Sequence, residues 1–198
     1  MTEPAPAAPG LPARLTAERY FALVDQGVLE ETDKVELLEG VVVAMTSENL
    51  WHANGVRLAY EALRTAVGAR AYVDQQHCFI AGHMSVPEPD VTVLPGKLTD
   101  YLSHHPSIAH LVVEVADSSL VQDRLTKSGI YAAAVIPEYW IVARRGDHVQ
   151  VSTSPIPSER RYATVRIARR GERIALIDLP GVSVTVDDLL PPADSGIE

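Results

Sequence analysis

Two carboxylates interrupt apolar segments in the middle of the chain. Asp90 follows Pro89 and opens the apolar run 91–94, and Glu114 lies inside the run 111–115. An ionisable group on a buried strand is costly unless it is paired with another charge or bound to a metal. Two such carboxylates on neighbouring core strands can converge on one divalent cation. With a lysine beside them, they would suit metal-assisted cleavage of a phosphodiester.

A lysine of this kind is available on the helix expected after the second run. Asp123, Lys127 and Tyr131 are spaced four residues apart and therefore share one helix face. In one interpretation Asp123 and Lys127 form an exposed ion pair worth only about 0.3 kcal/mol. In the other, Lys127 reaches Glu114 and places a positive charge beside a metal-bound water. The spacing is compatible with both.

The elements that would position these residues follow from periodicity, caps and helix breakers. Helices are expected at 16–26, 49–67 and 120–134. Strands are expected as a hairpin over 35–45 that turns at Glu39 and Gly40, and then at 71–74, 78–80, 91–94, 111–115, 139–142, 149–153, 162–167 and 174–177, with a last short strand or turn within 182–190. This succession predicts an α/β domain with a mixed sheet and an antiparallel meander toward the C-terminus.

Length and composition set the domain organisation. The 198 residues suffice for one α/β domain with a sizeable core. We expect a disordered, proline-rich arm over 1–14, a single domain over 15–190 and a polar tail over 191–198. No apolar run is long enough to cross a bilayer, and the N-terminus lacks the pattern of a signal peptide. The single cysteine, Cys78, excludes an internal disulfide, so a cytoplasmic location is expected. Cys78 itself fits a small buried hydrophobe better than a nucleophile.

The net charge of −9 argues at first against a nucleic-acid partner. Its distribution changes that interpretation, because residues 144–173 hold eight arginines and only three acids. A local arginine-rich stripe can contact phosphates although the whole molecule is acidic. The alternative is a solvated pair of edge strands whose charges deter aggregation.

Five short segments occur in an order found in a known family. They are Glu36-Leu37-Leu38-Glu39-Gly40, Pro89-Asp90-Val91, Leu111-Val112-Val113-Glu114-Val115, Asp123 with Lys127 and Tyr131, and Pro137-Glu138-Tyr139-Trp140. Over residues 16–180 the chain resembles the family of restriction endonucleases often called Uma, a branch of the PD-(D/E)xK nuclease superfamily. The resemblance implies a restriction-endonuclease-like fold, in which a mixed β-sheet is flanked by helices.

The resemblance also implies a metal site. Asp90 and Glu114 would ligate Mg²⁺, for which Mn²⁺ would substitute, and the carbonyl of Val115 or Ala116 would complete the shell. The superfamily places its lysine two residues after the glutamate, where this chain has Ala116, so Lys127 would be the counterpart. Further supporting roles are expected for an acid of the first hairpin, Glu36, and for Asp123 and Tyr131.

Other features bear on this site. Asp117-Ser118-Ser119 stands where the branch commonly has Ser-Pro-Ser, and Ala143-Arg144 where it often has an aspartate; neither change removes an expected ligand. The seven histidines show no metal-ligand spacing, so a histidine metal site is disfavoured. His52, near the start of the long helix, could border the cleft.

These inferences predict a metal-dependent endonuclease that hydrolyses phosphodiester bonds, with DNA as the expected substrate, and that acts as a homodimer because duplex cleavage needs two sites. One alternative is a catalytically silent module that keeps the fold for nucleic-acid binding or self-association. Another is a small-molecule hydrolase that uses the same carboxylates. The preferred nucleic acid, its sequence and the number of strands cut do not follow from the sequence.

Overall fold

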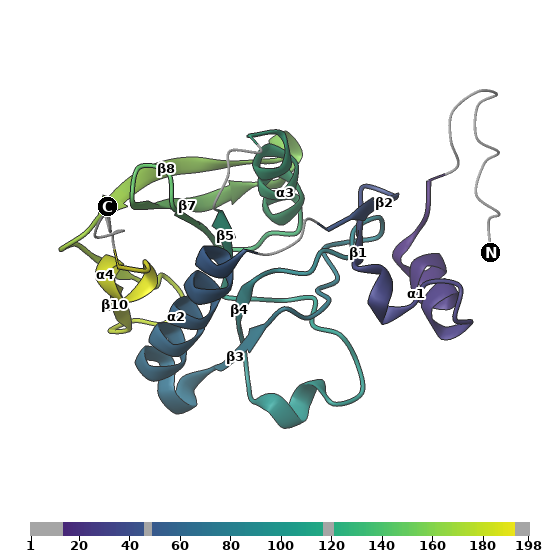
Figure 1. Cartoon of the computed structure of the whole chain (residues 1–198), viewed down its shortest axis with the longest axis horizontal. Coiled ribbons are helices and arrows are strands. Elements are labelled where there is room, and N and C mark those ends of the chain that lie inside the picture. The colour runs from purple at the N-terminus through teal and green to yellow at the C-terminus, as the bar shows by residue number, and fades with distance from the viewer. Residues whose placement is uncertain (1–13, 46–48, 117–120, 193–198) are drawn as a thin grey trace.

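The structure is a computed structural model that describes residues 14–45, 49–116 and 121–192, without the side chains of 31 and 121–124 (Figure 1). Nearly all of the expected N-terminal arm and most of the polar tail therefore lie outside the described residues, as does Asp117. Within the described ranges, none of the helices combines the length and the apolar character that crossing a bilayer requires.

A six-stranded mixed sheet forms the centre of the molecule. Its strands lie in the order β3-β4-β5-β6-β7-β8. All neighbours are antiparallel except β5 and β6, which are parallel and are connected through helix α3 (Val121–Ala133). The strands are β3 (Tyr72–Gln75), β4 (Val91–Leu94), β5 (Leu111–Ala116), β6 (Glu138–Ala143), β7 (His148–Ile156) and β8 (Arg161–Arg169). The predicted mixed sheet and C-terminal meander are thus confirmed.

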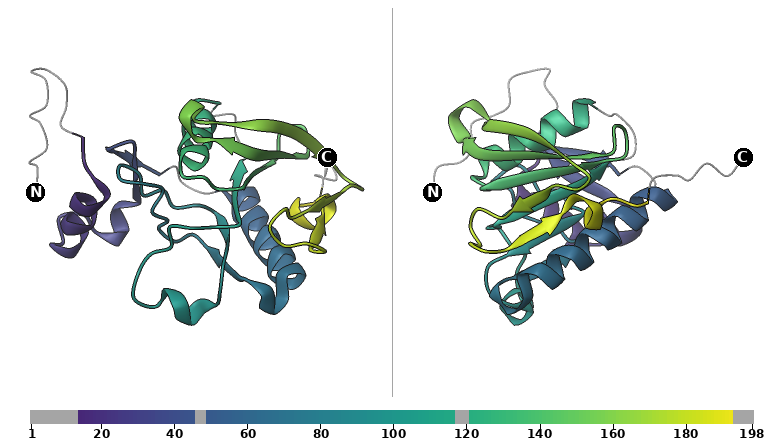
Figure 2. Two further views of the ribbon diagram at one scale, coloured as in Figure 1. Left: turned by 180° about the vertical axis from the view of Figure 1, so that it is seen from behind. Right: turned by 90° about the vertical axis from the view of Figure 1, so that its left-hand side faces the viewer.

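Helices cover both faces of this sheet (Figure 2). Helix α2 (Leu50–Val67) packs on one face together with the hairpin β9 (Arg173–Ala175) and β10 (Ser183–Thr185) and the short helix α4 (Val186–Leu189). Helix α3 packs on the other face. Side chains alternate along β5, so Val113 and Val115 face α2, while Val112 faces α3. Glu114 has the parity of Val112 and therefore also faces α3, the helix that carries Lys127.

The N-terminal region forms a smaller layer beside the sheet. Helix α1 (Ala17–Asp25) is capped by the Thr16 side chain, which accepts a hydrogen bond from the backbone N–H of Arg19. Strands β1 (Val35–Leu38) and β2 (Val41–Ala44) form the predicted hairpin. Its turn residues Glu39 and Gly40 both have positive φ, as the tight turns of hairpins require. Short 3₁₀ helices also occur between these elements, at Glu31–Asp33, Gly68–Arg70, Leu98–Tyr101 and Pro157–Glu159.

The strand predicted at 78–80 is wrong. The N–H of Phe79 donates to the carbonyl of Pro87, and the N–H of Ile80 donates to that of Pro106, so this segment is an irregular loop. Proline has no N–H, so a partner segment rich in proline cannot return the second set of ladder bonds. The last predicted element, 182–190, is resolved into strand β10 and helix α4.

Glu138 at the start of β6 is a buried acid outside the candidate site. Only 1% of it is exposed, its Oε1 accepts a 3.2 Å hydrogen bond from the N–H of Ile177, and its Oε2 has no partner among the described residues. Burial raises the pKa of this carboxyl from 4.5 to about 7. Between these two values the folded protein binds a proton that the unfolded chain releases, so stability falls as the pH rises from about 4.5 through 7.

Glu138→Gln removes this titration. We expect it to raise the free energy of unfolding by about 1–3 kcal/mol at pH 8, where Glu138 must carry a buried charge, and by little at pH 5. Urea unfolding of both proteins at the two pH values measures the difference. An equal effect at both pH values would contradict the assigned titration.

Candidate active site

Asp90 lies at the entrance of β4, next to the strand that carries Glu114. Its Oδ2 accepts a 2.6 Å hydrogen bond from the backbone N–H of Val115, on β5. Its Oδ1 lies 3.2 Å from Nε2 of His52, on the first turn of α2. Asp90 is only 7% exposed. Pro89 provides an extended entry without a ladder donor, and the carboxylate is fixed by bonds to two different elements.

Lys127 joins two acids from two other elements. Its Nζ lies 3.3 Å from Oε1 of Glu114 on β5 and 3.2 Å from Oε2 of Glu36 on β1. Glu114 Oε1 also accepts a 2.8 Å hydrogen bond from the hydroxyl of Tyr131, one turn further along α3. Spacing along the helix thus places Lys127 and Tyr131 on the face toward the sheet. Lys127 therefore contacts Glu114, while the side chain of Asp123, the other expected partner, lies outside the described ones.

Burial and charge act in opposite directions on these groups. Burial raises the pKa of Glu114 above its ordinary value, Asp90 and Glu36 raise it further, and Lys127 opposes the shift. Burial alone would lower the pKa of Lys127, but the carboxylates of Glu114, Glu36 and Asp90 outweigh it and raise the pKa. Lys127 therefore stays charged at neutral pH. Burial, followed by the charge of Glu114, raises the pKa of Tyr131, so its hydroxyl remains a hydrogen-bond donor.

His52 closes the α2 side of this cluster. Its Nδ1 lies 2.9 Å from the carbonyl oxygen of Val115, and its Nε2 faces Asp90. Both partners are acceptors, and a neutral imidazole can donate to only one of them. The helix comes this close because residue 55 is glycine: a Cβ there would lie 2.7 Å from Cγ1 of Val115. The first turn of α2 is therefore placed directly against β5.

The oxygen atoms at the site fit a hard divalent cation. Asp90, Glu114 and Glu36 supply carboxylates, and such all-oxygen donors suit magnesium or manganese better than zinc. Glu114 is also largely enclosed, with a side chain that is 14% exposed and a raised pKa, a shift that a bound cation would reverse. The expected carbonyl ligands are engaged within the protein, since Val115 faces His52 and Ala116 accepts from the N–H of Arg144. Among the described residues, no set of three or more His, Cys, Asp or Glu side chains is already gathered as a metal cage.

A model of the Uma2 family, described as "Putative restriction endonuclease", matches residues 17–187. The chain belongs to the Uma2 family. The search of curated proteins found no match. Among solved structures, a crystal structure described as a putative nuclease belonging to DUF820 from Anabaena variabilis ATCC 29413 is similar, with a TM-score of 0.68 and 12% sequence identity. The match covers 88% of this chain and 97% of that one, and at this identity it shows the fold.

In this Uma2 protein, sequence reasoning missed one acid near the site. Glu88 is two residues before Asp90, and its backbone N–H donates a 3.2 Å hydrogen bond to Oε2 of Glu36. Burial and the neighbouring Glu36 raise the pKa of the Glu88 carboxyl. The only hint in the sequence that Glu88 lies near the site was its position directly before Pro89 and Asp90. The side chain of Asp123 lies outside the described ones.

The structure also bears on the reactivity of Cys78 and on the surroundings of the arginine-rich stripe. Burial, with the charge of Glu88, raises the pKa of the Cys78 thiol to about 11, so the thiolate that a nucleophile needs is disfavoured. Within the arginine-rich stripe, several guanidiniums are paired with acids of the same protein: Arg160 with Glu39, Arg161 with Glu159, Arg166 with Glu172, and Arg170 with Asp147 and Asp187. These pairs favour the solvated-edge interpretation for half of the eight arginines.

His52→Ala tests how much the α2 contact stabilises the metal-free protein. Loss of two partly buried polar contacts leaves Asp90 and the Val115 carbonyl short of a partner, so we expect the free energy of unfolding to fall by about 1–3 kcal/mol. Urea unfolding in EDTA measures it. His77→Ala is the control, because its pair with Asp74 involves an imidazole that is 69% exposed, and its loss should change stability by less than about 0.5 kcal/mol. Equal losses in both variants would contradict the role of His52.

Proposed function

We propose that this Uma2 protein is a divalent-metal-dependent endonuclease that hydrolyses phosphodiester bonds in DNA. One observation carries the proposal: Lys127 lies within 3.3 Å of carboxylates on β1 and β5, beside the buried Asp90 of β4. Three strands and one helix thus bring acids and one cation together, near the start of β4 and the end of β5. The family match and the similar nuclease structure support the same class of activity.

Each residue has a distinct part in the proposed mechanism. Asp90 and Glu114 would hold Mg²⁺ or Mn²⁺, which when bound polarises a phosphoryl oxygen and lowers the pKa of a water. Lys127 orients the attacking water and stabilises the negative charge that develops on the phosphoryl group. Glu36 holds Lys127 in place through their ion pair, and Tyr131 fixes the orientation of Glu114 by its hydrogen bond. His52 positions Asp90 from the α2 side.

Plasmid nicking tests the proposal. We expect the purified protein to convert supercoiled plasmid to the open circle in Mg²⁺ or Mn²⁺ and to leave it intact in EDTA. The same preparation is assayed on a generic phosphodiester, because hydrolysis of that compound without nicking would indicate a small-molecule hydrolase instead. Size-exclusion chromatography tests the proposed homodimer. No nicking with either metal would overturn the nuclease assignment.

A second candidate function is a silent module that binds nucleic acid or self-associates. It is favoured by one observation: both oxygens of Asp90 are already engaged within the protein, by the Val115 N–H and by His52. A metal ligand would have to exchange at least one of these contacts. Retention of plasmid without nicking, and without measurable Mn²⁺ binding, would identify this alternative. For either function we propose a cytoplasmic location.

A further inference from the structure

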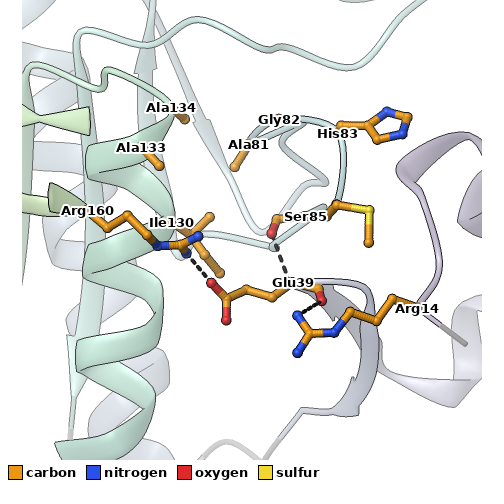
Figure 3. A pocket seen from close by; sticks show the side chains of 11 residues that line it. Arg14, Glu39, Ala81, Gly82, His83, Ser85, Ile130, Ala133, Ala134 and Arg160 are labelled. Carbon is orange, nitrogen blue, oxygen red and sulfur yellow. Dashed lines mark hydrogen bonds and ion pairs between the residues drawn. The ribbon is translucent and has the colours of Figure 1, made fainter. Parts of the chain in front are cut away.

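A pocket of about 290 Å³ lies between the β1–β2 turn, the loop 81–85 and the end of α3 (Figure 3). Two arginines and one acid line it together with small and apolar side chains: Arg14, Arg160, Glu39, Ala81, Ile130 and Ala134. The apolar part comes from α3 and from the loop, and the charged part from the hairpin turn and its neighbours. Because its charged and apolar residues come from different segments, the pocket can hold a group that is polar on one side.

Arg14 and Arg160 approach Glu39 from opposite sides (Figure 3). Arg160 Nη2 forms an ion pair with Glu39 Oε1, and Arg14 Nη1 donates a 3.1 Å hydrogen bond to the backbone carbonyl of Glu39. Two permanent positive charges thus flank one acid, Arg160 at its carboxylate and Arg14 at its backbone carbonyl. Each contact engages a single nitrogen of a guanidinium whose planar fork offers five N–H donors and matches a phosphate. The pocket therefore has an excess of positive charge in a protein that carries −9 overall.

The backbone places Arg160 over this pocket at some cost. Its φ is +53°, in the left-handed region, where a residue with a Cβ loses about 1–2 kcal/mol relative to the right-handed region. The conformation is held by a hydrogen bond from its N–H to the carbonyl of Pro157. It is also held by close packing on α3, where a Cβ at Gly129 would lie 3.3 Å from the carbonyl oxygen of Arg160. Glycine on the helix thus admits the loop that presents this guanidinium.

The pocket shares two elements with the candidate active site. Glu36 and Glu39 are three residues apart along β1 and its turn, which corresponds to about 10 Å of extended chain. Lys127 and Ala134 are seven residues apart at the end of α3, again about 10 Å. Successive phosphates of one DNA strand are about 3.4 Å apart along the helix axis and roughly twice that distance apart in space, so this separation corresponds to about one or two nucleotides. One strand could therefore reach both places.

We propose that this pocket binds a backbone phosphate of the substrate strand, about one or two nucleotides from the bond presented to Asp90 and Glu114. This proposal rests on the proposed function for its choice of substrate. Arg160 and Arg14 contact the phosphate oxygens, and Glu39 is the counter-ion that the phosphate replaces. The pocket positions the strand and reads no base, since contacts to phosphates carry no sequence information.

Binding of DNA without metal tests the proposal. Fluorescence anisotropy of a labelled duplex is measured in EDTA over a series of salt concentrations. We expect Arg160→Gln to weaken binding about 3- to 10-fold at low salt and to lower the slope of log K against log salt by about one. Arg14→Gln should act in the same direction. Glu39→Gln should strengthen binding, because the phosphate no longer competes with a carboxylate.

The chain offers a matched control pair in Arg64 and Glu61 on α2. Arg64 is 56% exposed and pairs with Glu61, much as Arg160, 51% exposed, pairs with Glu39. Arg64→Gln and Glu61→Gln should leave affinity and salt slope within about 1.5-fold of the unmodified protein, the level expected of an exposed charge away from the strand. An Arg160→Gln protein that behaves like the Arg64→Gln protein would overturn the proposal.

Two further outcomes would also overturn it. One is the absence of measurable DNA binding by the unmodified protein at low salt. The other is displacement of the duplex by an equimolar mononucleotide, because a subsite for one phosphate of a strand gains its affinity from the neighbouring contacts. Since no metal is present, these results are independent of cleavage. A protein that never nicks plasmid can still show the phosphate subsite, and an active nuclease can lack it.

Discussion

Lys127→Ala is expected to lower the rate of plasmid nicking by at least about 100-fold, the effect of removing one preorganised electrostatic contact to a transition state. Lys127 is the only one of the three lysines in the sequence that lies against Glu36 and Glu114. Its loss removes the positive charge that would face the developing negative charge on the phosphoryl group. Initial rates of open-circle formation in Mg²⁺ and in Mn²⁺ measure the change.

The variant also leaves buried carboxylates without their cation, so folding must be checked separately. Circular dichroism and the urea midpoint report this, and Lys127→Arg keeps the charge while altering its geometry. Lys97→Ala, at an exposed lysine, is the matched control and should nick at the rate of the unmodified protein. If a folded Lys127→Ala protein nicks as fast as the Lys97→Ala protein, Lys127 has no catalytic role.

Asp90→Ala is expected to abolish measurable binding of Mn²⁺ by the folded protein. Asp90 is the buried carboxylate that the β4 entrance brings beside β5, and the remaining acids, Glu114 and Glu36, are already paired with Lys127. Without Asp90 the site loses both a negative charge and a ligand, so the affinity for Mn²⁺ should fall by at least about 100-fold, more than the 10- to 100-fold typical of residues behind the ligands. Isothermal titration with Mn²⁺ measures this without any substrate.

The control for this variant is Asp74→Ala. Asp74 lies on the neighbouring strand β3, its side chain is 13% exposed against 10% for Asp90, and it accepts a hydrogen bond from the Tyr72 hydroxyl. Removing it should destabilise the protein but leave Mn²⁺ binding unchanged. Equal Mn²⁺ affinity of the Asp90→Ala and Asp74→Ala proteins would refute a metal site at Asp90.

The local elements were predictable because their signals are local. Thr16 caps α1, Gly68 ends α2, and Glu39-Gly40 turns the first hairpin, each as the sequence predicts. Asn49, expected as the first residue of the long helix, is its cap. The strand predicted at 78–80 failed because its pairing depends on a distant segment that proline makes unable to donate. An apolar run in the sequence does not show whether the segment beside it has backbone N–H groups to donate.

The convergence of Glu114 and Lys127 was predictable in part. The helix spacing of Lys127 and Tyr131 and the alternation along β5 limit the possible contacts to one face of one strand. The approach of Glu36, Glu88 and His52 was not predictable in the same way, because the β1–β2 hairpin, the 86–90 segment and α2 meet only through the order of the sheet and the layer beside it. Their places depend on contacts across 50 or more residues.

Gly55 has a consequence for how this fold can vary. At Gly55 only a hydrogen atom lies between the backbone of α2 and the side chain of Val115. Substitution by alanine would place a methyl group there and push the helix away from the sheet. This displacement would act three residues from His52, and would lift that imidazole from its carboxylate without changing any polar atom. Gly55, which has no side chain, thus determines how closely His52 can approach Asp90. Chimeras that exchange α2 should therefore keep glycine at this position.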